Sequence, residues 1–186
     1  MSADLRESNR GGIVDFVVLG LIMLGAQTIY DMNAAVKAGI SLFYSASYGS
    51  IQAAIAKLLR EGKIEIADYE TEGRRRKRYG ILPAGREAFY EWMMSIPSGT
   101  KLEVQILSRV YFAGLLPDDD GRKHLGENIR TAINNGLEEL LALEKTLDSM
   151  DVSGELQEVF RYQRATLRYG IESHTMARSF FERELP

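Results

Sequence analysis

Five consecutive cations, Arg74 to Arg78, stand between two short runs whose composition is typical of β-strands. The run before them is 64–69 (IEIADY), and the run that follows is 78–82 (RYGIL). Because Gly73 opens the basic stretch, the segment predicts a β-hairpin with a cationic tip. Such a tip repels itself unless an anion meets it, and the phosphate backbone of a nucleic acid is the commonest such anion. The alternative is a basic loop that is simply solvated.

Three helices are predicted ahead of the hairpin. The first covers residues 13–24, which are apolar nearly all round, so we expect it to be buried on most sides. The second covers 29–38, where Thr28 and Asp31 have the spacing of a capping box. The third covers 48–61 and carries its apolar residues at helical spacing on one side. Helices in this order, followed by a basic hairpin, predict a winged helix-turn-helix.

The third predicted helix combines small residues with cations on the side opposite its apolar stripe. A helix of that kind can approach a duplex closely, while a basic hairpin tip contacts phosphates. The candidate DNA-binding residues are Tyr48, Ser50, Gln52, Lys57, Arg74, Arg75, Arg76 and Lys77. Arg78 adjoins the strand and is expected instead to pair within the protein, with Glu70 or Glu72. An ordinary polar surface is the alternative for the helix residues.

A fourth helix is predicted from Pro83 to about Met94, because proline suits the first turn of a helix. Residues 95–99 (SIPSG) then form the clearest linker in the chain. The expected fold class is mainly α with a small β-hairpin wing. The expected parts are a polar N-terminal tail (1–12), a winged-helix DNA-binding domain (13–95) and a long-helix dimerisation domain (100–186).

Beyond the linker the pattern is helical to the end of the chain. One helix is predicted over 101–115, and two longer ones over about 122–149 and 155–183. Helices of roughly 28 residues are about 42 Å long at 1.5 Å per residue, which exceeds the width of a small domain. Amphipathic helices of that length usually pack against a partner chain. We therefore expect a homodimer that is held by the C-terminal helices.

The charge distribution separates the two halves of the chain. The net charge is −3, with 12 Lys/Arg and 11 Asp/Glu in residues 1–95 and with 11 and 15 in residues 96–186. The first half is therefore +1 and the second −4. This pattern suits a molecule with one surface for DNA and another surface for a different partner.

Several classes of function lack a signal in this chain. There is no cysteine, which fits a cytoplasmic location and leaves no thiolate metal site. The longest nearly uncharged run, 16–30, is shorter than the ~20 residues that a bilayer span requires. No phosphate loop, nucleophile elbow or metalloprotease motif indicates an enzyme, and His124 and His174 make a poor metal set. We therefore predict no cofactor, no metal and no membrane association.

Trp92, the only tryptophan of the chain, is a candidate for lining an effector pocket together with Tyr90 and Met93. The alternative is that Trp92 packs the helix after the hairpin onto the C-terminal helices. A single tryptophan in the apolar stripe of a helix is usually part of a core.

Residues 13–94 resemble the winged-helix domain of the PadR family of bacterial transcriptional regulators. The matching pieces are Val17–Ile22, Tyr30–Met32, Gly49–Ile51, Lys57–Ile64, Gly73–Tyr79, Ala84–Arg86 and Trp92. Further along, Tyr111–Leu115 and Leu167–Ile171 look like the helical dimerisation region of the longer PadR subgroup. The chain departs from the family at Gln52, where tyrosine is common, and at Tyr48, where proline is frequent.

The resemblance implies a homodimeric transcription factor, usually a repressor, with one winged helix on each half of a palindromic operator. Family members can be released from DNA by small phenolic or other hydrophobic effectors. Two binding modules of other classes stay open on the residues alone. One is an adaptor that uses its acidic helical half to bind a protein, and the other is a winged helix that binds RNA. An enzyme with an unrecognised site in the helical half is a third alternative.

Overall fold

The structure is a computed structural model that describes residues 12–25, 27–69, 76–99, 101–150 and 152–186. It divides the chain into two compact units. The first contains the residues up to 95 together with Gly99–Asp118, and the second contains Ile96–Ser98 with Asp119–Pro186. The chain therefore divides after residue 118, apart from the short piece Ile96–Ser98, whereas the linker pattern placed the boundary at 95–99.

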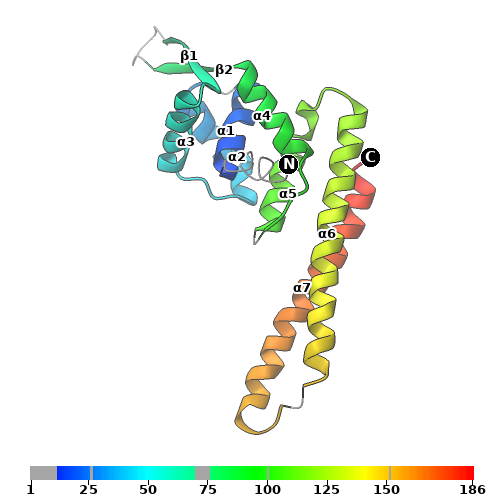
Figure 1. The fold of residues 1–186 in the computed structure, drawn as a ribbon. Helices are drawn as coiled ribbons and strands as arrows, with labels where there is room; N and C mark the ends of the chain where they lie inside the picture. The colour runs from blue at the N-terminus through cyan, green and yellow to red at the C-terminus, as the bar shows by residue number, and fades with distance from the viewer. Residues whose placement is uncertain (1–11, 26, 70–75, 100, 151) are drawn as a thin grey trace, which may run out of the picture. The chain divides into compact units, whose positions relative to one another are not determined.

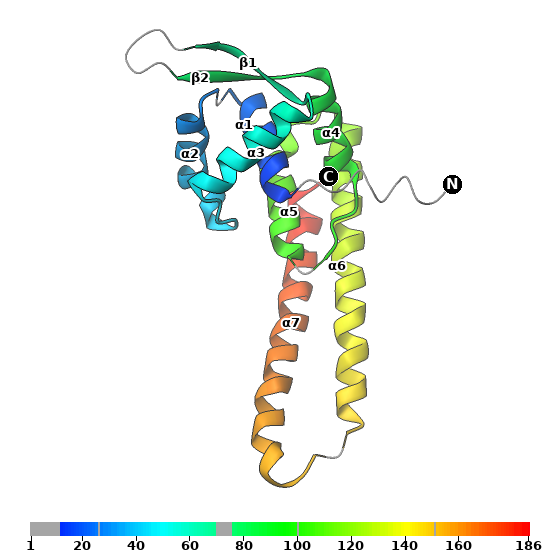
Figure 2. The ribbon, with the colours of Figure 1, turned by 60° about the vertical axis from the view of Figure 1, so that its left-hand side comes forward.

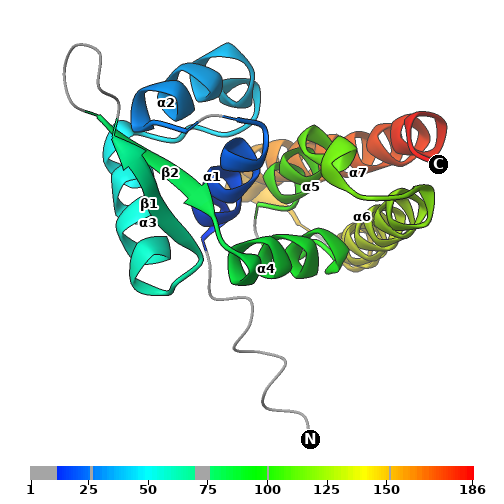
Figure 3. The same cartoon turned by 90° about the horizontal axis from the view of Figure 1, so that it is seen from above.

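The first unit has the predicted fold class, mainly α with one β-hairpin (Figure 1). Its elements are α1 (Ile13–Met23), α2 (Ile29–Ala38), the short 3₁₀ helix η2 (Ile40–Leu42), α3 (Tyr48–Arg60), β1 (Ile64–Tyr69), β2 (Lys77–Ile81), α4 (Pro83–Met94), α5 (Leu102–Tyr111) and the 3₁₀ helix η3 (Ala113–Leu115). Seen from above, the hairpin lies beside α3 (Figure 3).

Helix α1 lies at the centre of this unit. Its residues from Asp15 to Ile22 are all buried, as the nearly continuous apolar sequence predicted. The helices α2, α3, α4 and α5 and the strand β2 all pack on it. A helix without a polar face can be stable only when neighbours cover every side, and these elements supply that cover.

The predicted helix starts are confirmed by their capping contacts. The Thr28 hydroxyl accepts a hydrogen bond from the Asp31 amide at 3.2 Å, and the Asp31 carboxylate accepts one from the Thr28 amide at 2.9 Å. At the start of α3, the Ser47 side chain accepts from the Ser50 amide at 3.1 Å. These bonds satisfy amide groups that the first turn of a helix leaves without an intrahelical partner.

The hairpin is antiparallel, with Ile64 opposite Ile81 and Ile66 opposite Tyr79. An irregularity between Ile66 and Asp68 then shifts the register, so that Asp68 pairs with Arg78. A bulge of this kind bends its strand and increases the local twist. The tip of the hairpin, 70–75, lies outside the described residues, and with it the predicted contacts Arg74 and Arg75.

Helix α5 belongs to the first unit because the residue after it, Phe112, reaches the central helix. A Cβ atom on Gly20 would lie 2.7 Å from the Phe112 ring, so only glycine leaves room for the ring there. The same ring meets Phe89 of α4 edge to face, with centroids 5.9 Å apart. The 95–99 segment therefore marks a change of direction in the chain rather than the end of a packed core.

The second unit is a pair of long helices, α6 (Asp119–Asp148) and α7 (Gln157–Glu184), with the 3₁₀ helix η4 (Gly154–Leu156) before α7. The two helices run side by side (Figure 2). Helix α6 buries a stripe that includes Leu125, Ile129 and Ile133, while α7 buries Leu167 and Phe181. In the described part of the chain, none of the helices has both the length and the apolar character that a bilayer span needs.

Candidate nucleic-acid interface

Helix α3 has two contrasting sides. Its inner side packs on α1 through Ile51, Ala54, Ile55 and Leu58, all of them buried. Its outer side carries Gly49, Gln52, Ala53, Ala56 and Arg60, which are exposed. The outer side is therefore a surface of small residues with one amide and one cation. A surface of this shape fits the requirement for close approach of a helix to a duplex groove.

Tyr48 and Ser50 lie in the first turn of α3. The Tyr48 side chain is about half exposed at 49%. The Ser50 hydroxyl donates to the Ser47 carbonyl at 2.8 Å, so its proton is used within the turn while its oxygen can still accept. Tyr48 and Ser50 therefore both lie at the N-terminal end of α3.

The hairpin carries its described cations on β2 and directly before it. Arg76, Lys77 and Arg78 are all exposed. The Arg76 guanidinium lies 5.0 Å from the ring centroid of Tyr30, an exposed residue of α2. Arg76 and Lys77 are thus both on the surface, as predicted for residues that contact phosphate.

Arg78 differs from its neighbours because it donates a hydrogen bond to the side-chain oxygen of Gln27. The expected partners, Glu70 and Glu72, lie outside the described residues. Gln27 also uses its backbone carbonyl, which accepts from the Tyr79 amide at 2.8 Å. Gln27, which lies just before α2, therefore binds β2 at two neighbouring residues, Arg78 and Tyr79. No pattern in the sequence singled out Gln27, because its role depends on a contact 51 residues away.

A groove of about 580 Å³ runs between α3 and the hairpin. Its lining consists of Ile29, Gln52, Ala53, Ile55, Ala56, Leu59, Lys77 and Tyr79. It brings together an amide from α3 and a cation from β2 that were predicted as DNA contacts. The pKa of Tyr79 is raised above its usual 10.0, first by burial and then by the nearby phenols of Tyr48 and Tyr69. The phenol in the groove is therefore a neutral hydrogen-bonding group.

Lys57 is the predicted contact whose surroundings differ most from the others. Its ammonium lies 2.6 Å from a carboxylate oxygen of Asp15, whose side chain is 7% exposed. Asp15 is the polar residue among the buried residues of α1. The sequence signal for this pair was a single acid in an otherwise apolar helix, and it was missed.

The three residues predicted for an effector pocket do not line one cavity. Trp92 and Met93 are 4% and 0% exposed, and the Trp92 ring stacks on Phe16 with centroids 4.8 Å apart. They are core residues of the first unit. Tyr90 is half-buried, and its hydroxyl donates to the Leu115 carbonyl at 3.4 Å.

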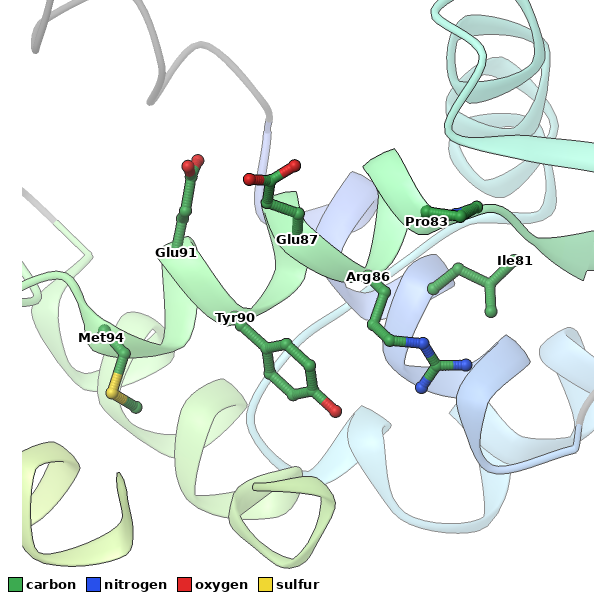
Figure 4. Close-up of a pocket in the computed structure, with 7 residues that line it drawn as sticks. All are labelled: Ile81, Pro83, Arg86, Glu87, Tyr90, Glu91 and Met94. Atoms are coloured by element: carbon green, nitrogen blue, oxygen red, sulfur yellow. The ribbon is translucent and has the colours of Figure 1, made fainter. Parts of the chain in front are cut away.

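Tyr90 does line an open cavity of about 850 Å³ on the outer side of α4. The other lining residues are Ile81, Pro83, Arg86, Glu87, Glu91 and Met94. Arg86 and Tyr90 project from one side of the helix, and Glu87 and Glu91 project from the other (Figure 4). The lining of the cavity thus combines apolar side chains with one cation and two acids. That chemistry suits a small amphipathic ligand better than a purely apolar one.

A buried cation, Arg109 of α5, stands next to Trp92. The guanidinium lies 4.4 Å from the ring centroid and donates to the Trp92 carbonyl at 3.1 Å and to the Ser95 hydroxyl at 3.0 Å. Burial lowers the pKa of Arg109 to about 10. These bonds satisfy the last turn of α4 and tie that helix to α5.

Across the described ranges, no group of three His, Asp or Glu residues could hold a metal ion.

The comparisons with known proteins concern both units. Residues 105–185 match the model of the family described as Virulence activator alpha C-term. No curated protein matches the chain. Among solved structures, PadR from Bacillus subtilis in complex with operator DNA is 22% identical, covers 92% of this chain and 97% of its own, and has a TM-score of 0.43.

Two further solved structures are similar in the same way. The Bacillus subtilis PadR in complex with p-coumaric acid is 20% identical, with 92% of each chain covered and a TM-score of 0.39. A PadR-like transcriptional regulator from Bacillus cereus is 25% identical, with 95% of each chain covered and a TM-score of 0.43.

Proposed function

We propose that this chain, which is similar to PadR-family regulators over more than nine-tenths of its length, is a transcriptional regulator that binds double-stranded DNA. The observation that supports this most directly is the groove between α3 and the hairpin. There, the exposed small-residue side of one helix lies next to the cationic strand β2, and Gln52 and Lys77 line the same surface.

In the proposed complex, α3 enters the major groove and the hairpin follows the adjacent backbone. Gln52 can donate and accept toward a base edge, and the methyl groups of Ala53 and Ala56 leave room for the helix to sit deep. Arg76 and Lys77, with Arg74 and Arg75 of the tip, neutralise phosphates. Four such contacts correspond to a slope of about −4 per protomer in the logarithm of affinity against the logarithm of salt concentration.

The second unit is proposed to hold two copies of the chain together. Helix α7 leaves a row of large apolar side chains exposed, at spacings of three, four or seven residues. The row consists of Val159, Tyr162, Tyr169, Met176 and Phe180, which are 45–74% exposed. Such spacing places them along one side of the helix, as in the seam of a coiled coil. A second copy that covers this row would supply the second winged helix that a palindromic operator requires.

The regulator is further proposed to act as a repressor that a small hydrophobic effector releases. The cavity beside Tyr90 is the candidate site in the first unit, because its floor is apolar and Arg86 could pair with an acidic group of the ligand. A ligand that binds one state of the dimer about 5- to 150-fold more tightly would shift DNA binding by the same factor.

The proposal is tested by binding of the purified protein to fragments of its own upstream DNA. The fragments are titrated at several salt concentrations against a scrambled duplex. We expect tight binding that resists the competitor and strengthens as salt falls. Arg75→Ala combined with Arg76→Ala should weaken binding to every duplex and flatten the salt dependence. The matched control is Lys123→Ala combined with Lys145→Ala, which removes two exposed cations from α6.

Other outcomes would identify the alternatives. Weak binding that the scrambled duplex abolishes, together with a stable complex with another protein, would indicate the adaptor. Tighter binding to hairpin RNA than to duplex DNA would indicate the RNA-binding winged helix. A wild-type salt dependence in the Arg75 and Arg76 double variant would contradict the role of the hairpin tip.

A further inference from the structure

Asp15 is an acidic side chain in an otherwise apolar part of α1. It is 5% exposed, and the residues that follow it in α1, from Phe16 to Ile22, are buried and carry no charge. A carboxylate in such a place is strongly unfavourable unless a cation and hydrogen bonds compensate it. The compensating cation comes from α3, where the Lys57 ammonium lies 2.6 Å from the Asp15 carboxylate.

Three further titratable groups lie around this pair. One carboxylate oxygen of Glu61 (Oε1) is 3.9 Å from the Lys57 ammonium, and the other (Oε2) is 2.9 Å from the Lys63 ammonium. Tyr44 lies on the other side, and its pKa is raised first by burial and then by the charge of Asp15. Lys57 is thus flanked by two acids, so its charge is offset within the protein and adds little to the positive surface that DNA would meet.

The buried residues of α3 are apolar. Ile51, Ile55 and Leu58 face α1 through side chains that have no directional preference. The buried stripe decides which side of α3 faces inward, but apolar contacts alone leave the helix free to turn by small angles about its axis. A short bond between two charges has direction. Buried pairs of this kind are best attested as devices that select one register.

The spacing of residues on α3 shows what that rotation would control. Lys57 lies on the edge of the helix that contacts Asp15 of α1. Gln52 and Ala56 lie on the side that lines the groove with Lys77 and Tyr79. A turn of α3 about its axis would move these groove residues away from the hairpin. The Asp15 contact is therefore placed where it can hold the base-facing side in position.

We propose that the Asp15–Lys57 pair sets the rotation of α3, so that Lys57 is a positioning residue of the DNA interface and not a phosphate contact. This inference rests on the proposed DNA-binding function. It replaces the role that the sequence predicted for Lys57. It also assigns Asp15 a part in sequence discrimination, although the residue is buried and lies in a different helix.

The experiment compares a duplex selected by the wild-type protein with a scrambled duplex of equal length, each titrated over a range of salt. The variants are Lys57→Met and Asp15→Asn. We expect each to lose about tenfold or more on the selected duplex, comparable to one good base contact. We expect little change on the scrambled duplex, and a salt slope that moves by less than the ~0.9 of a lost phosphate contact.

The matched control is Arg60→Met, which removes an exposed cation from the same helix and leaves the Asp15 pair intact. It should weaken the two duplexes by the same factor, because a phosphate contact carries no sequence information. Lys57→Arg keeps a cation near Asp15 and should recover most of the preference for the selected duplex.

Two results would overturn the inference. If Lys57→Met flattens the salt slope by about 0.9 per protomer and Asp15→Asn binds as wild type, Lys57 is a phosphate contact. If neither variant changes the ratio of the two affinities, the pair only stabilises the fold. Should Lys57→Met fail to fold, the double variant Asp15→Asn with Lys57→Met, which leaves no unpaired buried charge, takes its place. A wild-type protein that selects no duplex would instead refute the DNA-binding proposal.

Discussion

Helices α1 and α7 differ in how much of their apolar surface the chain itself buries. Helix α1 buries eight of its 11 residues, whereas α7 buries two of its 28. The first unit satisfies its central helix with elements of the same chain. The second unit leaves large side chains such as Tyr169 and Met176 exposed at 74% and 68%. The first unit should therefore be stable by itself, and the second should depend on protein concentration.

The largest effect is expected from Phe112→Ala in the first unit. Phe112 is 1% exposed and fills the space next to Gly20, so its truncation should lower the free energy of unfolding by about 3–5 kcal/mol. Urea unfolding followed by the fluorescence of Trp92 reports this unit directly. The loss should be the same at every protein concentration.

The matched control for Phe112→Ala is Leu42→Ala, which truncates an apolar side chain that is 88% exposed in the same unit. We expect the control to stay within about 0.5 kcal/mol of wild type. An unchanged Trp92 transition in Phe112→Ala would mean that α5 is not part of this core.

The second largest effect is expected from Tyr169→Glu, and it should appear in association rather than in folding of the first unit. A carboxylate in the apolar row of α7 should weaken dimerisation by roughly 2–3 kcal/mol, or about 30- to 160-fold. Sedimentation equilibrium measures the change. Thr175→Glu adds the same charge to α7 at an exposed position outside the row and should leave the equilibrium as it is. Equal effects of the two variants would exclude the row as the contact.

A smaller effect should separate two neighbouring cations of β2. Lys77→Ala should flatten the salt slope of DNA binding by about 0.9 per protomer, because it removes one of the proposed phosphate contacts. Arg78→Ala should change the slope less and loosen the hairpin, because its guanidinium is bonded to Gln27. Titration of both variants at several salt concentrations checks the difference. The reverse order would mean that Arg78 leaves Gln27 for the phosphate backbone.

The smallest effect concerns Glu61 at the end of α3. A hydrogen bond from Lys63 lowers the pKa of Glu61 below its usual 4.5. A lowered carboxylate pKa stabilises the fold above the usual value, and that contribution disappears as pH falls through the folded-state pKa. Because the pair is about one-third exposed, Glu61→Gln should cost no more than ~0.5 kcal/mol at pH 7. Denaturant midpoints of variant and wild type should converge as pH falls below the folded-state pKa of Glu61, and a constant difference would contradict this explanation.

The local structure of the first unit was largely predictable from the sequence. The starts of α2, α3 and α4 follow from Thr28, Ser47 and Pro83, whose preferences act within one turn of the helix. The hairpin follows from two β-like runs on either side of a basic turn. Each of these signals concerns residues that are close in sequence, so the physics that decides them is visible in the sequence itself.

The contacts that could not be predicted join residues far apart in the chain. Lys57 looked like a surface cation of α3 because its partner, Asp15, is 42 residues away. For Trp92 the sequence left two roles open, a pocket lining and a core position, and the contacts with Phe16 of α1 and Arg109 of α5 select the core. Gln27 carried no signal at all. In each case the side chain has a chemistry that suits two roles, and only the packing of distant helices selects one.

The close fit of Phe112 against Gly20 also determines where the chain can be divided to make a chimeric protein. The SIPSG segment looks like a suitable fusion point, but a first unit that ended there would lack Phe112, which contacts Phe89, and Arg109, which contacts Trp92. A chimera that keeps residues 99–118 with the rest of the first unit retains the residues that cover Phe89 and Trp92. The module for transferring the proposed DNA-binding unit to another protein is therefore longer than the winged helix, and it ends just before α6.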